Sequence, residues 1–506
     1  MSGSAARSRQ RWPLLALLLL FGLYRVGLLG RGTQSIGDEL LYYHAPVALE
    51  LLLRGEGGAA LAQLDHSLGR PGQMLLALPP AAVQLLLHGA LGLPVACPDS
   101  LLVPALQNVL LSLLGAWALH CVARRLLLAE GPALCVTAIY GLLASANMYV
   151  RHILPYDAAL SLGLCALALA LREARGPRPD LTTGLVLGSA YACYPGYWAL
   201  PPVVLAAVAA RPASGLAGRA RALVWVGLGG LLVALACELA AAAAGRSYLG
   251  SLRALSGTIR LGSFEEAWRF LPRHLLATQG PWGAALLLLG LACPLGLALR
   301  RGRRAPVTLL ALLAAAGLCY LLHGALSAWE KMVFYGRVVR LYHPFLVLAA
   351  VGTACVLPRP LRRAAQVVLL LCALAGFLRF ALPYQRLAYP RDVLYREGVW
   401  TLRQPPERML YEFPPFRPIQ SPPGWSRGGQ RYREEPRLVL VNFAYFAPVL
   451  AAEHVAFRPP PGARLRFDGP HFLAFPAYGF EGHAPAERQA LWSFAPRIQI
   501  WELAGP

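Results

Sequence analysis

The sequence predicts a polytopic α-helical membrane protein with a small extracytoplasmic α/β domain at its C-terminal end. Of its 506 residues, 57% are hydrophobic and 14% are charged, whereas soluble domains carry about 25% charged residues. The apolar residues form runs long enough to cross a bilayer, and arginine clusters separate these runs. These observations exclude an ordinary soluble enzyme. The net charge of +22 comes from the clusters, so it indicates a positive-inside topology in a lipid bilayer and not a nucleic-acid partner.

The first apolar run, residues 12–29, follows three arginines and has no small-residue cleavage site after it. We therefore expect a retained first helix with a cytoplasmic N-terminus. Residues 30–102 form the first extracytoplasmic loop, and within it residues 74–96 are apolar but interrupted by Pro79 and Pro80. If this segment does not span, every later arginine cluster falls on the side opposite the loop, so we expect an interfacial or re-entrant segment.

Ten further apolar runs bring the expected number of spans to about 11. They lie at approximately residues 103–123, 131–149, 157–172, 182–194, 197–211, 222–244, 281–299, 306–324, 341–357 and 365–383. The runs 182–194 and 197–211 are short, and the turn Tyr194-Pro195-Gly196 between them predicts two half-helices.

The last segment, residues 384–506, is polar, begins with proline-rich sequence and is expected outside the membrane. Within it, residues 437–442 and 497–502 alternate in the manner of short strands, which predicts a small α/β domain. The ten cysteines of the chain are scattered singly, mostly within apolar runs. They indicate small core residues and not a disulfide framework or a metal site.

Two adjacent carboxylates, Asp38 and Glu39, follow the first apolar run, and Tyr42 and Tyr43 come soon after them. Ionised groups cost several kcal/mol in hydrocarbon, so these carboxylates must face water, a partner or a substrate. One interpretation is a catalytic pair at the mouth of the first helix. The other is that the two acids only mark where this helix leaves the bilayer.

Two further groups of candidates lie on the same predicted side. The link between two spans carries Arg151 and Asp157, for which a mutual ion pair explains the charges as well as a direct catalytic role does. Arg337 and Arg340 begin the span 341–357, together with Tyr342, on the side where arginines are otherwise sparse. Arginine binds phosphate through two N–H groups, so these two arginines are candidates for a phosphate site. Their alternative role is to reach lipid headgroups.

These residues resemble, in order and spacing, the motifs of the GT-C glycosyltransferases. The most similar branch is the group of dolichyl-phosphate-mannose–protein mannosyltransferases and lipid A aminoarabinose transferases. Gly37-Asp38-Glu39 resembles its Asp-Glu motif, Arg151–Asp157 resembles its charged link, and Arg340-Leu-Tyr-His-Pro344 resembles its Arg-Tyr-x-x-Pro motif. Gly69-Arg70-Pro71-Gly72 stands where that group has His-Pro-Pro-Leu, and here the sequence departs from the pattern.

The resemblance implies that residues 1–383 form a GT-C-like catalytic domain in the cell's inner membrane. It implies transfer of a sugar from a polyprenyl-phosphate-linked donor to a protein, lipid or glycan acceptor on the non-cytoplasmic side. Asp38 matches the general base, Glu39 would orient the base or the acceptor, and Arg340 with Arg337 would hold the phosphate leaving group. Some relatives use a divalent metal, but no Asp-x-Asp occurs here, so no metal ligand is assigned.

Two alternatives stay open at this point. A transporter or flippase of lipid-linked glycans would also place charges in a membrane cavity. Inverted repeats would support that alternative, and the sequence shows none. A non-catalytic membrane assembly factor is the other alternative, and the departure at residues 69–72 keeps it open. The sequence identifies neither the sugar nor the acceptor, nor the oligomeric state or the role of the C-terminal domain.

Overall fold

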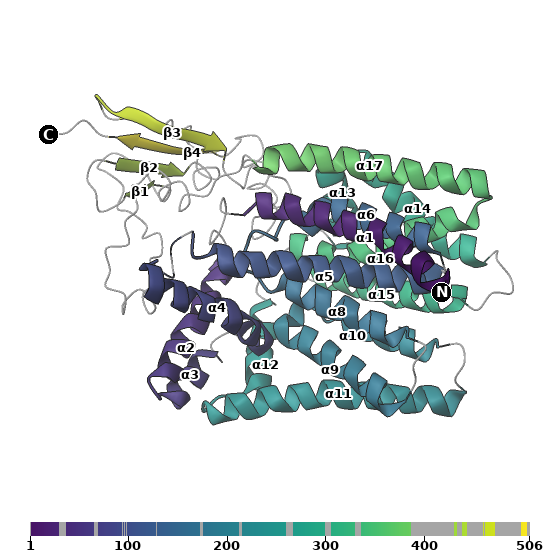
Figure 1. Ribbon diagram of the computed structural model, residues 1–506, viewed down its shortest axis with the longest axis horizontal. Helices are drawn as coiled ribbons and strands as arrows, with labels where there is room; N and C mark the ends of the chain where they lie inside the picture. The colour runs from purple at the N-terminus through teal and green to yellow at the C-terminus, as the bar shows by residue number, and fades with distance from the viewer. Residues whose placement is uncertain are drawn as a thin grey trace.

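The protein is a helical bundle with a small antiparallel sheet, as the computed structural model shows (Figure 1). The structure describes residues 2–29, 37–64, 69–93, 95, 97, 99–127, 129–172, 176–211, 215–259, 267–298, 305–328, 335–385, 430–432, 438–442, 459, 461–470 and 497–502. In Figure 1, long helices from distant parts of the sequence run in the same direction across the picture.

The helices of the bundle match the predicted apolar runs. They are α1 (Ser2–Gly27), α5 (Leu102–Leu127), α6 (Glu130–Leu142), α8 (Tyr156–Ala170), α9 (Pro177–Cys193), α10 (Leu200–Ala209), α11 (Leu216–Ala243), α14 (Trp282–Ala298), α15 (Ala305–Ala328), α16 (Tyr335–Val356) and α17 (Arg359–Gln385). Among the described residues, six helices are long and apolar enough to cross a membrane, and several shorter helices are also apolar. The predicted class, a polytopic α-helical membrane protein, is therefore confirmed.

Glycines allow a close crossing in the bundle, between α9 and α11. A Cβ atom added to Gly184 would lie 2.0 Å from the carbonyl oxygen of Val226, and one added to Gly229 would lie 2.4 Å from that of Leu181. Only glycine permits backbones to approach so closely, which is how helices without a hydrophobic driving force between them gain packing contacts in a membrane. The opposite side of α11 exposes Leu231, Leu235 and Leu239, as a lipid-facing stripe would.

The expectation of one continuous span over residues 131–149 is wrong. Helix α6 ends at Leu142, Leu143 is extended, and a single turn, α7 (Ala144–Asn147), follows. The Asn147 amide donates hydrogen bonds of 2.9 Å to the carbonyl oxygens of Gly141 and Leu143. This side chain satisfies the backbone groups that the break frees, which is the condition for irregular backbone at membrane depth. The predicted turn at residues 194–196 is present, since η2 (Pro195–Tyr197) separates α9 from α10.

The remaining helical elements lie between these helices in the sequence. They are η1 (Gly37–Tyr43), α2 (His44–Leu53), α3 (Gly57–Leu64), α4 (Pro71–Leu91), α12 (Tyr248–Ile259), η3 (Ala267–Arg269) and α13 (Phe270–Gln279). Helices α2, α3, α4 and α12 gather at one end of the bundle (Figure 1). By length and composition α4 is one of the six candidate spans, whereas the sequence predicted a segment that does not cross. Its place at the end of the bundle fits that prediction.

The C-terminal segment contributes four short strands: β1 (Gln430–Tyr432), β2 (Leu438–Asn442), β3 (Arg464–Pro470) and β4 (Arg497–Glu502). All pairings are antiparallel, in the order β1-β2-β4-β3. Strands β2 and β4 coincide with the two predicted strands. After α17 ends at Gln385, the described residues of this segment contain no helix, so the predicted α/β character is met only in its β part. The division into domains at residue 383 stays a prediction.

Candidate active site

The carboxylate of Glu39 fastens the first loop to the link between α7 and α8. Glu39 lies in η1 and is completely buried. Its Oε1 accepts a 2.8 Å hydrogen bond from the backbone N–H of Ile153, and its Oε2 lies 3.2 Å from Nδ1 of His152. These contacts fix η1 against the link, although Glu39 precedes His152 by 113 residues and Ile153 by 114 residues. Glu39 therefore holds the link in place, and its predicted part in catalysis stays a prediction.

Asp38 directly precedes Glu39 as the second residue of η1. Its side chain lies outside the described part of the chain, so its role as general base stays a prediction. The backbone of η1 nevertheless fixes where this residue is: next to a buried carboxylate that is bound to the link.

The link is also held from the side of α5. The Asn108 amide donates a hydrogen bond to the carbonyl oxygen of His152, whose ring faces Glu39. His152 and Arg151 are completely buried. The link ends where α8 begins, and this places Asp157 in the first turn of α8, where the partial positive charge of the helix N-terminus stabilises a carboxylate.

Asp157 and Arg340 form a buried ion pair. The Oδ1 of Asp157 accepts a hydrogen bond from Nη2 of Arg340. The Asp157 side chain is 2% exposed and the Arg340 side chain is 1% exposed. The guanidinium carbon of Arg340 also lies 5.8 Å from the centre of the Tyr149 ring. The sequence placed both charges on one side of the membrane. The ion pair described for Asp157 is with Arg340 of α16, whereas the sequence analysis considered a pair with Arg151.

A chain of aromatic rings leads away from this ion pair. The Tyr149 ring lies 5.1 Å from Tyr156, and Tyr156 lies 4.8 Å from Tyr194. The guanidinium of Arg70 lies 5.1 Å from the Tyr194 ring. Arg70 belongs to the stretch that departs from the family's His-Pro-Pro-Leu pattern. It therefore brings a second buried arginine to the aromatic chain, at the point where α4 begins.

A further buried arginine comes from α1. Arg25 donates hydrogen bonds of 3.1 Å to Oδ1 of Asn147 and 3.0 Å to Oγ of Ser112. Asn147 is two residues from Tyr149, so Arg25 is held next to the segment that leads into the link. Sequence reasoning missed Arg25, although a charged residue inside an apolar run was a visible signal.

Of the other predicted site residues, Tyr42 and Tyr342 lie in different parts of the bundle, and only the backbone of Arg337 is described. Tyr42 is buried beside the link, and its hydroxyl donates to Gln84 of α4. Burial, with a smaller contribution from Tyr43, raises the Tyr42 pKa well above its usual value, so this phenol stays neutral. The Tyr342 hydroxyl pairs with His323 of α15 and so belongs to the packing between α15 and α16. Arg337 lies in the first turn of α16, and its side chain is outside the described part.

A second polar cluster, which the sequence did not reveal, joins α7, α13 and α16. The His343 Nδ1 is hydrogen-bonded to Oγ of Ser145, and the His274 and His343 rings are 5.6 Å apart. Burial lowers the pKa of His274 in α13 to about 3, so this imidazole is neutral at physiological pH. Within the described residues, no group of three His, Cys, Asp or Glu side chains is placed to hold a metal ion.

The chain resembles a solved structure in its fold, whereas the sequence comparisons find no match. No protein-family model matches the chain, and no curated protein matches it. The fold is similar to the crystal structure of ArnT from Cupriavidus metallidurans bound to undecaprenyl phosphate, with 15% sequence identity, 74% of this chain and 76% of that chain covered, and a TM-score of 0.46. At this level of similarity we transfer no site and no activity from that protein to this chain.

Proposed function

We propose that this protein is a membrane glycosyltransferase that takes a sugar from a polyprenyl-phosphate-linked donor on the non-cytoplasmic side. The observation that carries the proposal is a concentration of buried guanidinium groups around the link and the aromatic chain that leads from it. Arg25, Arg151 and Arg340 are at most 1% exposed, and Arg70 is 6% exposed. Several buried cations close together create a positive potential that attracts an anion. A phosphate group brought in by a lipid carrier fits this setting.

The chemistry requires one base and one group that stabilises the leaving phosphate. A hydroxyl oxygen of the acceptor attacks the anomeric carbon while the bond from that carbon to the phosphate oxygen breaks. The phosphate leaves with the electron pair, and the acceptor's proton passes to a carboxylate. We assign the proton to Asp38 and the stabilisation of the phosphate charge to Arg340, supported by Arg337.

The ion pair gives Arg340 its part in this mechanism. A guanidinium has five N–H donors in a planar fork, and Asp157 takes a hydrogen bond from Nη2. The carboxylate thereby fixes the orientation of the fork before a ligand arrives. Such preorganisation is what makes electrostatic stabilisation effective, because no rearrangement is needed during the reaction.

An apolar groove supports a carrier that stays in the membrane. It lies between α9, α10, α11 and the start of α12, and has a volume of about 220 Å³. Its lining is almost entirely apolar and includes Tyr191, Leu205 and Val233. Tyr191 lies in the last turn of α9, three residues before Tyr194 of the aromatic chain. An isoprenoid chain in this groove would keep its phosphate near the outer end of the bundle.

The test is transfer of radiolabelled sugar by the purified protein in proteoliposomes. We expect transfer from a polyprenyl-phosphate sugar and none from a nucleotide sugar when no polyprenyl phosphate is added. Transfer from the nucleotide sugar alone would overturn the assignment of the donor. Movement of a lipid-linked glycan across the bilayer without transfer would replace the enzyme by a flippase.

A further inference from the structure

The short helix that carries Asp38 and Glu39 is attached to the bundle at more than one point. Within η1, Glu39 is bound to the link, as described above. Tyr42 follows three residues later, and side chains three residues apart lie above one another in a 3₁₀-helix. Glu39 and Tyr42 therefore share one face of η1, and both are buried. Tyr42 gives η1 a second attachment, which the mechanism above does not use.

The second attachment is to Gln84 of α4. This side chain is completely buried, and its Oε1 accepts a hydrogen bond from the Tyr42 hydroxyl. Its Nε2 lies 3.0 Å from the carbonyl oxygen and 2.9 Å from the Oγ of Ser100, and 3.1 Å from the carbonyl oxygen of Val95. An amide nitrogen only donates, so these three oxygens determine which way the amide points. The Gln84 oxygen consequently faces Tyr42, and the phenol is the donor.

The sequence of α4 gives Gln84 this place. Ala77, Ala81 and Gln84 are spaced by four and three residues, so they lie on one face of the helix, and all three are buried. Tyr42 belongs to the same apolar cluster as the two alanines, whose small side chains leave room for its ring. A buried amide without partners would cost free energy. Here Tyr42 and Ser100 supply partners, so Gln84 joins α4 both to η1 and to the segment before α5.

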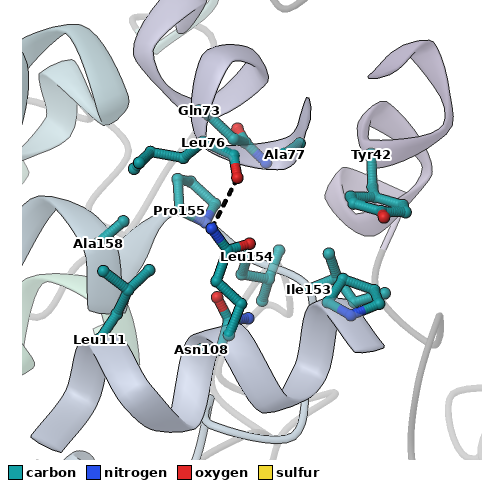
Figure 2. A pocket seen from close by; sticks show the side chains of 12 residues that line it. Tyr42, Gln73, Leu76, Ala77, Asn108, Leu111, Ile153, Leu154, Pro155 and Ala158 are labelled. Carbon is teal, nitrogen blue, oxygen red and sulfur yellow. Dashed lines mark hydrogen bonds between the residues drawn. The ribbon is translucent and has the colours of Figure 1, made fainter. Parts of the chain in front are cut away.

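Close packing does not fully fix η1 against the link. A pocket lies between them and is lined by Tyr42 and Ile153, together with residues of α4 and α5. Figure 2 shows Tyr42 and Ile153 on one side of this pocket and Leu111 and Ala158 on the other. Atoms that border a pocket have no protein atoms packed against them on that side, so they gain less dispersion energy there. The position of η1 therefore depends on the hydrogen bonds of Glu39 and Tyr42 as well as on packing.

We propose that Gln84 is a positioning residue, which through Tyr42 fixes the place of η1 and with it the predicted base Asp38. A single attachment at Glu39 would let the short helix pivot, whereas a second attachment to a different helix prevents that rotation. This inference rests on the proposed glycosyl transfer for its catalytic meaning, but the attachment itself is measurable without any transfer. Because the donor phosphate is assigned to Arg340 of α16, loss of the attachment should lower kcat and leave the KM for the donor unchanged.

The test combines hydrogen exchange with steady-state kinetics on the full-length protein in lipid nanodiscs. Mass spectrometry follows exchange of the backbone N–H groups of η1, which reports local opening. We expect Gln84→Leu to speed this exchange by about 10-fold, because the hydrogen bond to Tyr42 is lost. The same variant should lower kcat by about 10-fold or more, since misplacing a reacting group by about 1 Å costs up to about 100-fold. Its KM for the polyprenyl-phosphate donor should stay within about twofold of the wild-type value.

The matched control is Gln107→Leu. Gln107 of α5 also binds α4, since its Nε2 donates to the carbonyl oxygen of Leu76 at 2.7 Å, the bond drawn as a dashed line in Figure 2. It lines the same pocket as Tyr42. Its replacement therefore removes a glutamine bond to α4 but keeps the attachment of Tyr42 to Gln84. We expect η1 exchange and kcat of this control to stay within about twofold of the wild type.

A merely structural role for Gln84 predicts a different result. In that case Gln84→Leu lowers the melting temperature, but its folded fraction keeps the wild-type kcat and the wild-type exchange in η1, and the proposal is overturned. If Gln84→Leu does not fold, Tyr42→Phe decides, because it removes only the hydroxyl and leaves the contacts of Gln84 with Ser100. The proposal requires faster η1 exchange and a lower kcat in Tyr42→Phe. A wild-type value of either quantity in that variant would overturn it.

Failure of this inference and failure of the proposed function are distinguishable. If the wild type transfers sugar from no donor, the proposed function fails, and hydrogen exchange alone then decides the attachment. Faster η1 exchange in Gln84→Leu and Tyr42→Phe would support it, and unchanged exchange in both would overturn it. If the wild type is active and both variants combine fast η1 exchange with a normal kcat, Gln84 holds η1 without positioning the base, which overturns the inference.

Discussion

Asp157 and Arg340 are 183 residues apart in sequence, yet they form a buried ion pair between the first turn of α8 and the start of α16. The pair joins the link, which Glu39 fixes, to the helix that carries the predicted phosphate-binding arginines. It therefore couples the two halves of the candidate active site. Removing one partner leaves a charge buried in a medium of low polarity, so the pair lends itself to a quantitative test.

We expect Asp157→Asn to lower the free energy of unfolding by about 3–5 kcal/mol, because it leaves the Arg340 charge without its carboxylate. The double variant Asp157→Leu with Arg340→Met should recover most of that loss, since it buries no charge. Denaturant melts in detergent measure both. The control is Glu50→Gln at the more exposed Glu50–Arg54 pair of α2, for which about 1 kcal/mol or less is expected. Equal effects at the two pairs would contradict a structural role for the buried pair.

Glu39 should act through the link and not on the substrate. We expect Glu39→Gln to keep most of the transfer activity, because its amide oxygen still accepts from the Ile153 N–H. Glu39→Ala removes both hydrogen bonds and should lower kcat by about 10-fold or more, since misplacing reacting groups by about 1 Å costs up to 100-fold. Steady-state kinetics of both variants measure this difference. A Gln variant as inactive as the Ala variant would instead give the Glu39 charge a direct role.

The long helices and two of the four strands were predictable because apolar length and alternation are local properties of the sequence. The shared side of Asp38, Asp157 and Arg340 was predictable from the arginine pattern. The partner of Asp157 was not, because it depends on where the whole bundle brings the start of α8 and the start of α16. The break after Leu142 was not predictable for a similar reason. The hydrogen bonds that stabilise it come from Asn147, five residues downstream, and the apolar run itself gives no sign of a break.

Asp38 is the predicted base. We expect Asp38→Asn to keep the fold and the binding of the lipid carrier but to lower turnover by roughly 100-fold or more, the usual scale for a lost general base. Radiolabelled transfer measures turnover, and thermal melting checks the fold. The matched control is Glu56→Gln, an exposed acid of the same loop, which should change neither. Full activity of Asp38→Asn would leave Asp38 as a marker of the helix end.

Arg340→Lys tests the phosphate contact. Lysine keeps the charge but loses the planar fork that binds phosphate through two N–H groups. We expect the KM for the polyprenyl-phosphate donor to rise by about 10-fold or more, whereas the KM for the acceptor should change little. Such a ratio corresponds to the loss of about one charge-assisted hydrogen bond. If only the KM for the acceptor increased, Arg340 would bind the acceptor and not the donor.

His274 should make the protein sensitive to acid. Its pKa is about 3 in the folded protein and ordinarily near 6.5, so the unfolded state binds a proton more readily. Stability is complete above pH 6.5 and is lost progressively as the pH falls toward 3. At pH 5 the loss from this residue is about 2 kcal/mol. His274→Phe should remove it, as urea melts at pH 7 and pH 5 would show, whereas the control His88→Phe should not. An unchanged pH dependence in His274→Phe would contradict this origin of the sensitivity.

The place of α4 at the end of the bundle predicts which residues share a side of the membrane. If α4 does not cross, Glu56 before it and Asp99 after it both face outward, whereas Arg124 at the end of α5 faces the cytoplasm. All three side chains are exposed, so single cysteines there should react with a membrane-impermeant maleimide. We expect labelling of Glu56→Cys and Asp99→Cys from outside intact cells, and of Arg124→Cys only after permeabilisation. The unmodified protein, with its ten native cysteines, sets the background. Labelling of Glu56→Cys and Asp99→Cys from opposite sides would show that α4 spans the bilayer, and the arginine clusters that follow it would then need a different explanation.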